Sequence, residues 1–209
     1  MGFDAPYPYH LADCGDFDIC GYKRPQSFFR DLLWGVRTAP FIGVLDPQHY
    51  GKPIAFNPWG WEPVIDSWTF PGEEGKPTQV DVYAIDAEVE LFLNGVSVGR
   101  KPAGAASQNK ATFEVTYHPG TIEAGGDTGG KETGRTRLVT TFSPASLRLT
   151  PDRATLKAIY GDLAYVTIEV VDEDGVVVKH GEPLISLETS GAGELIAVGT
   201  ATRSPRSRM

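Results

Sequence analysis

One glycine-rich stretch of this sequence carries residue types that could bind a phosphate group. Residues 125–131 contain two glycines five positions apart followed by Lys131, which is close to the pattern of a phosphate-binding loop. Glu132 stands where that loop needs a serine or threonine for magnesium, and residues 133–141 favour a strand rather than a helix. We therefore expect no nucleotide site here.

A second set of residues could in principle ligate a metal ion. His10, Cys14 and Cys20 lie close together in the sequence, but their spacing fits no zinc pattern and a fourth ligand is not evident. Two cysteines also make no disulfide framework. We interpret Cys14 and Cys20 as two half-buried thiols in a loop.

A third stretch, Asp172-Glu173-Asp174-Gly175, is similar to the start of a calcium-binding loop. Its fifth position is Val176 and its twelfth is Pro183, so the oxygen ligands of such a loop are absent. We predict a solvated turn there, and we expect neither a metal nor another cofactor in this chain.

The elements that must position such residues are mainly β-strands. Residues 80–101 read as three short strands with apolar residues at every second position. Asn94-Gly95 separates the second strand from the third, and Asn-Gly between two alternating runs is a strong hairpin signal. Strands are also expected over residues 111–117, 135–142 and 165–171, whereas we expect a ragged or disordered hairpin between residues 121 and 134.

One short helix is predicted near the start of the chain. Pro25 is a good first-turn residue, and Gly35 is a plausible stop. An apolar stripe runs along this helix, formed by Phe28, Phe29, Leu32 and Leu33. We expect this stripe to dock on the β-structure, to pair with another copy of the chain, or to remain exposed as a face for self-association.

Composition limits the partners. The chain has 209 residues and a formal net charge of −8, which argues against nucleic acid and anionic membranes as partners. No apolar run approaches the roughly 18 residues that span a membrane. No signal peptide is visible at the start of the sequence.

Four segments, in this order along the chain, resemble parts of glycoside hydrolase family 2, the β-galactosidase family: residues 14–35, 47–53, 88–101 and 149–172. The resemblance implies three regions. Residues 1–37 would be the last loop and helix of a (β/α)₈ barrel, residues 38–145 a β-sandwich, and residues 146–209 an incomplete immunoglobulin-like domain. The fold class implied is mainly β: an immunoglobulin-like β-sandwich and a partial second sandwich, with a loop-helix remnant of a TIM barrel.

The same resemblance implies a retaining glycosidase as the parent enzyme. Such enzymes need two carboxylates about 5 to 5.5 Å apart, one of them an acid with a raised pKa. In this family the acid follows asparagine, but Asn57, Asn94 and Asn109 precede Pro, Gly and Lys here. We therefore expect no catalytic residue in this chain and predict that it is inactive alone, with a carbohydrate substrate bound through a barrel that the chain does not contain.

Three residues are candidates for contact with substrate. The loop that carries Asp16 and Asp18 would face the substrate side of the intact barrel, because βα loops form the active-site face. Loop capping is the alternative role for both. Among Trp59, Trp61 and Trp68, Trp61 is our candidate for stacking on a sugar, and the alternative is that these tryptophans anchor packed surfaces.

Three functions remain open from the sequence. The chain is the C-terminal accessory part of a β-galactosidase-like hydrolase, a stand-alone carbohydrate-binding module, or a structural β-sandwich without sugar contact. The sequence does not identify the glycan, the oligomeric state or the compartment.

Overall fold

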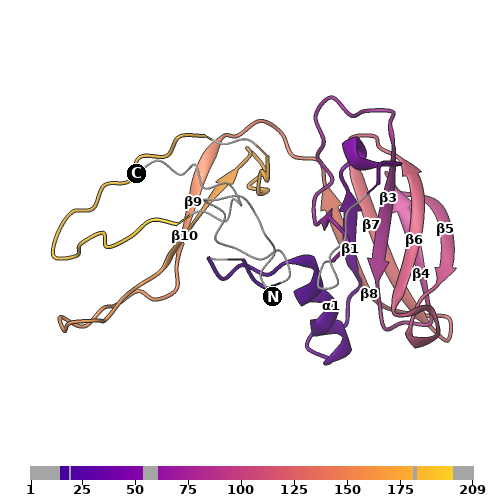
Figure 1. The fold of residues 1–209 in the computed structure, drawn as a ribbon, viewed down its shortest axis with the longest axis horizontal. Coiled ribbons are helices and arrows are strands. Elements are labelled where there is room, and N and C mark those ends of the chain that lie inside the picture. The colour runs from indigo at the N-terminus through magenta and orange to yellow at the C-terminus, as the bar shows by residue number, and fades with distance from the viewer. Residues whose placement is uncertain (1–14, 19, 54–60, 181–182, 200–209) are drawn as a thin grey trace.

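The computed structural model describes residues 15–18, 20–53, 61–180 and 183–199, and these are mainly β (Figure 1). The elements are α1 (Pro25–Leu33), β1 (Phe41–Leu45), β2 (Val64–Ile65), β3 (Pro77–Tyr83), β4 (Glu88–Leu93), β5 (Val96–Pro102), β6 (Lys110–Thr116), β7 (Thr121–Thr128), β8 (Lys131–Val139), β9 (Ser146–Pro151) and β10 (Val166–Val171), with short 3-10 turns at Pro47–His49 and Ala105–Ser107. No helix among the described residues is long and apolar enough to cross a membrane.

Two four-stranded antiparallel sheets form the main body. One has the strand order β2-β1-β3-β6 and the other β5-β4-β7-β8, as the layers at the right of Figure 1 show. Successive side chains on a strand point to opposite faces of the sheet. The apolar residues at every second position therefore point into the space between the two sheets. The resulting core contains residues from both sheets, including Ile42, Val82, Leu91, Phe113 and Ile122.

Trp68 is the largest side chain in this core. It is 1% exposed, and its ring meets Tyr117 edge to face with the ring centroids 5.0 Å apart. Its indole Nε1 donates a hydrogen bond to the carbonyl oxygen of His118 at 3.1 Å, so the polar atom of this side chain is satisfied. Trp68 is therefore a core anchor and is not accessible for sugar stacking.

The predicted Asn94-Gly95 hairpin is confirmed. Asn94 has φ 48° and Gly95 has φ 80°, and they join β4 to β5. Both turn residues have the positive φ that a tight two-residue hairpin requires. The three strands predicted over residues 80–101 exist as β3, β4 and β5, but the expectation that they form one antiparallel meander is wrong. The chain changes sheets after β3, which pairs with β1 and β6, whereas β4 and β5 belong to the second sheet.

The expectation of a ragged hairpin over residues 121–134 is wrong. β7 and β8 pair along almost their whole length, with one register shift between Gly126 and Asp127 and a turn at Gly129 and Gly130. The glycines that made this stretch a weak strand by sequence serve close packing. A Cβ atom on Gly126 would lie 2.3 Å from Oδ2 of Asp86, and one on Gly134 would lie 2.9 Å from the Cα of Ala39.

The predicted helix is confirmed, and it docks on the outer face of the first sheet. Leu32 is buried there, and Phe28 stacks on Phe41 with ring centroids 4.7 Å apart. Phe29 contacts Tyr83 in the same apolar cluster. Of the three outcomes expected for the apolar stripe, docking on the β-structure is the one found for three of its four residues, whereas Leu33 is 47% exposed, beside Trp34.

A separate two-stranded ribbon follows the main body. β9 pairs with β10 over six residues, which agrees with the strand predicted over residues 165–171. Leu147 lies opposite Val170 and Leu149 opposite Ile168, so one face of the ribbon is apolar, while the Arg148–Glu169 ion pair lies on the other. This apolar face is open to solvent, as the 58% exposure of Leu149 shows. Within residues 146–180 and 183–199, where a partial second sandwich is expected, β9 and β10 form the one sheet.

The turn predicted at residues 172–175 is also present. The Asp172 carboxylate accepts hydrogen bonds from the backbone N–H groups of Asp174, Val176 and Phe142. Burial opposes the charge of Asp172, but these backbone donors outweigh it and lower its pKa. The predicted turn is thus present, but Asp172 itself is 2% exposed rather than solvated, and its carboxylate ties the turn to the end of the main body.

Candidate functional site

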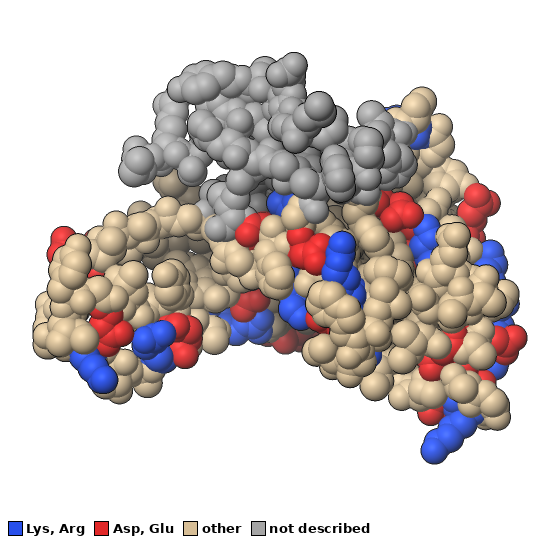
Figure 2. Space-filling view, turned by 60° about the horizontal axis from the view of Figure 1, so that its bottom comes forward, with Lys and Arg blue, Asp and Glu red and all other residues tan. Residues whose placement is uncertain are grey.

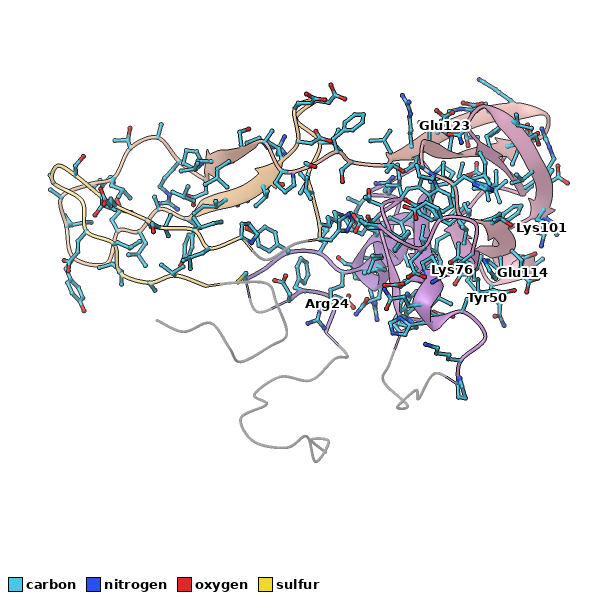
Figure 3. The ribbon with its side chains drawn as sticks, turned by 90° about the horizontal axis from the view of Figure 1, so that it is seen from above. Arg24, Tyr50, Lys76, Lys101, Glu114 and Glu123 are labelled. Carbon is cyan, nitrogen blue, oxygen red and sulfur yellow. The ribbon has the colours of Figure 1, made fainter. Side chains whose placement is uncertain are left out.

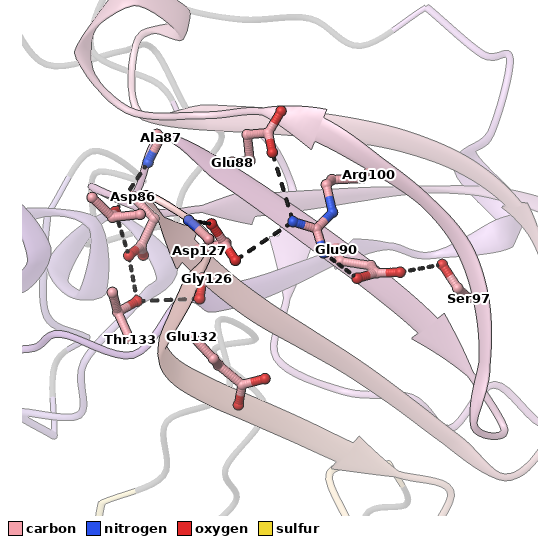
Figure 4. Close-up of polar contacts among 12 residues, drawn as sticks. Asp86, Ala87, Glu88, Glu90, Ser97, Arg100, Gly126, Asp127, Glu132 and Thr133 are labelled. Atoms are coloured by element: carbon pink, nitrogen blue, oxygen red, sulfur yellow. Dashed lines mark hydrogen bonds and ion pairs between the residues drawn. The ribbon is translucent and has the colours of Figure 1, made fainter.

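A polar cluster with a shallow depression beside it lies on the outer face of the second sheet (Figure 4). Arg100 of β5 is its centre: its guanidinium lies 2.8 Å from Glu90, 3.5 Å from Asp127 and 3.7 Å from Glu88. Ser97 donates to the second oxygen of Glu90 at 2.7 Å. These residues are brought together because β4, β5 and β7 are neighbours in the sheet.

Arg135 of β8 forms a second group on the same face. Its guanidinium contacts Glu132 at 2.7 Å and Glu123 at 3.3 Å, and it covers the ring of Phe92 at 4.8 Å from the centroid. A shallow depression, open to solvent, lies between Arg100 and Arg135. On the face of the molecule seen in Figure 2, Lys and Arg side chains are interspersed with Asp and Glu side chains.

The carboxylates of this depression are set up as acceptors, not as acids. Hydrogen bonds from Ser97 and Arg100 lower the pKa of Glu90, and the hydrogen bond from Arg135 lowers the pKa of Glu132. A glycosidase general acid needs the opposite shift, so that it still carries its proton near neutral pH. The depression can hydrogen-bond a polar ligand, but Glu90 and Glu132 are poor proton donors.

A carboxyl group with a raised pKa lies on the other sheet. Asp81 of β3 is fully buried, and burial raises its pKa, while hydrogen bonds from Thr112 and Gln79 offset part of that effect. Lys110 lies 3.9 Å from Asp81 and 2.7 Å from Glu62. Burial disfavours the charge of Lys110, but Glu62 and Asp81 outweigh it and raise its pKa. Asp81 is therefore a buried partner of Lys110 without access to substrate.

Asp81 predicts a specific pH dependence of stability. Its pKa in the folded protein lies above the ordinary value of 3.8, so the folded chain binds this proton more tightly than the unfolded chain. The free energy of unfolding should therefore fall as pH rises from 3.8 through the raised folded pKa. Asp81→Asn should remove this fall, measured by urea unfolding at a series of pH values. If the free energy of unfolding of both proteins depended on pH in the same way, the raised pKa of Asp81 would be contradicted.

The two aspartates proposed from the N-terminal loop are both engaged in local structure. Asp16 pairs with Arg30 of α1 at 2.7 Å. Asp18 accepts hydrogen bonds from the backbone N–H groups of Cys20 and Tyr22 at 2.8 and 2.9 Å. Asp18 thus caps its own loop, and neither aspartate lies near the depression on the second sheet.

Trp61 is half-buried on the outer face of the first sheet. Its ring packs against Phe29 at 5.2 Å and Tyr83 at 5.7 Å between centroids. The next residue, Glu62, carries the ion pair to Lys110. Trp61 therefore combines a partly open ring with adjacent polar groups, whereas Trp59 lies outside the described residues.

The sequence predicts half-buried thiols at Cys14 and Cys20 rather than a metal site with His10, and for Cys20 the half-buried state is wrong because its side chain is exposed. His10 and Cys14 lie outside the described residues, and Cys20 is a free thiol whose pKa is raised by partial burial and by Asp18. Within the described ranges there is no group of three or more His, Cys, Asp or Glu side chains that could hold a metal ion.

Sequence reasoning missed the two polar clusters because each depends on pairing between strands. Glu90, Arg100 and Asp127 come from three strands, and their meeting follows from a register that no local pattern reveals. On the first sheet, Tyr50 lies beside Glu114 of β6 (Figure 3), and burial and this carboxylate raise the pKa of Tyr50. The sequence signal that could have revealed the cluster around Arg100 is the charge at alternate positions of β4, Glu88 and Glu90.

Two family models match the chain. Residues 75–134 match the model described as "Domain of unknown function (DUF4982)", which covers β3 to β8 in part. Residues 147–208 match "Glycoside hydrolase family 2 C-terminal domain 5". The second match includes the ribbon and the segment after it.

Similar proteins agree with these matches. "Beta-galactosidase BoGH2A" of Bacteroides ovatus is 34% identical over 199 residues, covering 87% of this chain and 21% of the relative. A "Putative beta-glucuronidase" of Formosa agariphila is 29% identical over 186 residues, covering 88% and 16%. A solved glycosyl hydrolase family 2 member from Bacteroides cellulosilyticus has a TM-score of 0.73 and 36% identity, covering 82% of this chain and 23% of that one. The chain thus spans about a fifth of the length of these relatives.

Proposed function

We propose that this chain, which corresponds to the C-terminal domains of glycoside hydrolase family 2 enzymes of the β-galactosidase and β-glucuronidase type, is an accessory region without hydrolytic chemistry of its own. The observation that carries the proposal is 34% identity to a β-galactosidase over 87% of the chain, confined to 21% of that relative. An enzyme built on this plan would hydrolyse O-glycosyl bonds with residues supplied by the rest of its length.

The state of the carboxylates supports this proposal. A retaining glycosidase pairs a nucleophile with an acid of raised pKa. Glu90 and Glu132 have lowered pKa values, and Asp81, whose pKa is raised, is fully buried against Lys110. No Asn-Glu dipeptide occurs in the sequence.

We also propose that three regions of the chain belong to three different domains of the parent enzyme. Residues 1–37 would be the last loop and helix of a catalytic barrel, residues 38–145 an immunoglobulin-like sandwich, and residues 146–209 part of a further immunoglobulin-like domain. On this arrangement Asp16 and Asp18 lie on the side of the barrel that faces substrate. The docking of α1 on the first sheet supports a role for this sandwich in holding the end of the barrel.

The purified chain should not hydrolyse aryl β-galactosides or aryl β-glucuronides. The reason is that the part of the chain that the structure describes shows no accessible carboxylate with a raised pKa beside a second carboxylate that could act as nucleophile. Release of the aryl alcohol should equal the buffer blank. Turnover that survives repurification, and that Glu90→Gln abolishes, would overturn the proposal.

A second candidate function is sugar contact at Trp61. A pyranose face can stack on the open part of its ring while Glu62 and Lys110 offer polar groups. Galactose should then quench tryptophan fluorescence in the parent chain and in Trp34→Ala, but not in Trp61→Ala. Trp34 is the matched control because it is 73% exposed and lies at the end of α1. Equal quenching in all three proteins would exclude Trp61 as the contact.

A further inference from the structure

Asn94-Gly95 is the only Asn-Gly dipeptide among the three asparagines of the sequence. Both residues lie in the exposed turn between β4 and β5, where water has access. We propose that Asn94 is a site of spontaneous covalent modification by deamidation, and that a side-chain clamp to the neighbouring β6–β7 turn controls its rate.

The reaction needs only water besides the chain itself. The backbone nitrogen of Gly95 loses its proton to solvent and attacks Cγ of Asn94, forming the N–Cγ bond of a five-membered succinimide. The Cγ–Nδ2 bond breaks, and Nδ2 leaves as ammonia with a proton from solvent. Water then opens the ring at either carbonyl and gives aspartate or isoaspartate at position 94. Glycine at the next position favours the attack because it has no side chain to obstruct the ring.

The fold holds the reacting group away from that attack. Oδ1 of Asn94 accepts a hydrogen bond from the backbone N–H of Thr121 at 2.7 Å, and Nδ2 donates to the carbonyl oxygen of Pro119 at 3.3 Å. The Asn94 amide is therefore engaged at both ends by the turn that precedes β7. Gly120, between these two partners, has φ 130°, and a Cβ atom there would lie 1.9 Å from Oδ1. Close approach of Asn94 thus depends on this glycine.

Breaking the clamp must precede ring closure. Turning the side-chain amide toward the Gly95 nitrogen would break its hydrogen bonds to Pro119 and Thr121. The folded chain should therefore react by local opening, at a rate reduced by the fraction of time that the clamp is open. Two hydrogen bonds should slow the reaction at least about tenfold relative to the unfolded chain.

The product weakens the same connection. A carboxylate at position 94 no longer donates to Pro119 and places negative charge against its carbonyl oxygen. Isoaspartate in addition lengthens the backbone of a two-residue turn whose geometry requires positive φ at both positions. Modification should therefore loosen the β4–β5 hairpin from the β6–β7 turn.

The first experiment compares the full chain in mildly alkaline buffer with the same chain in urea. Ion exchange separates the more acidic product, and peptide mass spectrometry locates it and distinguishes aspartate from isoaspartate. We expect product at Asn94 in urea, and formation at least about tenfold slower in buffer. No product at Asn94 in urea would overturn the site, and equal rates would overturn control by the clamp.

A matched pair of variants tests the clamp itself. Thr140 accepts a hydrogen bond from the Gly120 N–H at 3.0 Å, whereas the adjacent Thr141 contacts Thr69 instead. Thr140→Val should loosen the Gly120 turn and speed modification of the folded chain several-fold, while its rate in urea stays that of the parent. Thr141→Val should leave both rates unchanged. Equal acceleration by both variants, or none by Thr140→Val, would overturn the role of the turn.

Discussion

Trp68→Ala is expected to lower the free energy of unfolding by about 3 to 5 kcal/mol. Trp68 is 1% exposed, and its ring lies against Tyr117 in the core between the two sheets. Truncation leaves a large cavity and also leaves the carbonyl oxygen of His118 without the indole donor. Urea unfolding followed by far-ultraviolet circular dichroism measures the loss without relying on tryptophan fluorescence.

Trp34→Ala is the matched control for this change. Trp34 is 73% exposed at the end of α1, so the same truncation removes few contacts there. We expect its free energy of unfolding to stay within about 0.5 kcal/mol of the parent value. A similar loss from both variants would show that the core is not centred on Trp68.

Gly126→Ala is expected to destabilise the chain by on the order of 3 kcal/mol, although it adds a single methyl group. That methyl would lie 2.3 Å from Oδ2 of Asp86, which is 3% exposed. Asp86 would have to move, and it would then lose the hydroxyl donors of Thr128 and Thr133. The unfolding midpoint in urea should fall accordingly.

Gly125→Ala tests whether the effect is specific to that side of β7. A Cβ atom on Gly125 would lie 3.4 Å from the end of the flexible Arg135 side chain, which is ordinary contact. Alanine is also preferred to glycine within a strand because glycine weakens it. We expect Gly125→Ala to be neutral or mildly stabilising, and an equal loss from both variants would contradict the role given to Asp86.

The sequence predicted those strands whose apolar alternation was strong. Residues 80–101 predict β3, β4 and β5, and the Asn-Gly dipeptide predicts the turn between β4 and β5, whereas the register shift between Leu91 and Phe92 and the change of sheet after β3 have no such local signal. The prediction failed at β7, where Gly125 and Gly126 interrupt the alternation. Glycine has low strand preference, but tertiary contact with Asp86 outweighs that preference here. No local pattern could reveal a partner about forty residues away.

The candidate sites were harder to predict than the strands. Asp81 occupies an outward position of β3, and the alternation alone suggests a solvated carboxylate. Its burial depends on Lys110, Glu62 and the segment that carries Trp61, which the fold brings over the outer face of the sheet. Composition and spacing describe one strand at a time, whereas these clusters require the pairing of several.

The open apolar face of the β9–β10 ribbon implies that this chain loses its structure in stages. A two-stranded ribbon is marginal in water, and here Leu149 and Val166 of the apolar face remain 58% and 49% exposed. Amide hydrogens of β9 and β10 should exchange with deuterium through small local fluctuations. Those of β3, β4 and β7, which flank a closed core, should exchange only when the whole sandwich opens. The ribbon should therefore unfold before the sandwich, and a protease would cut the ribbon while the sandwich is still folded.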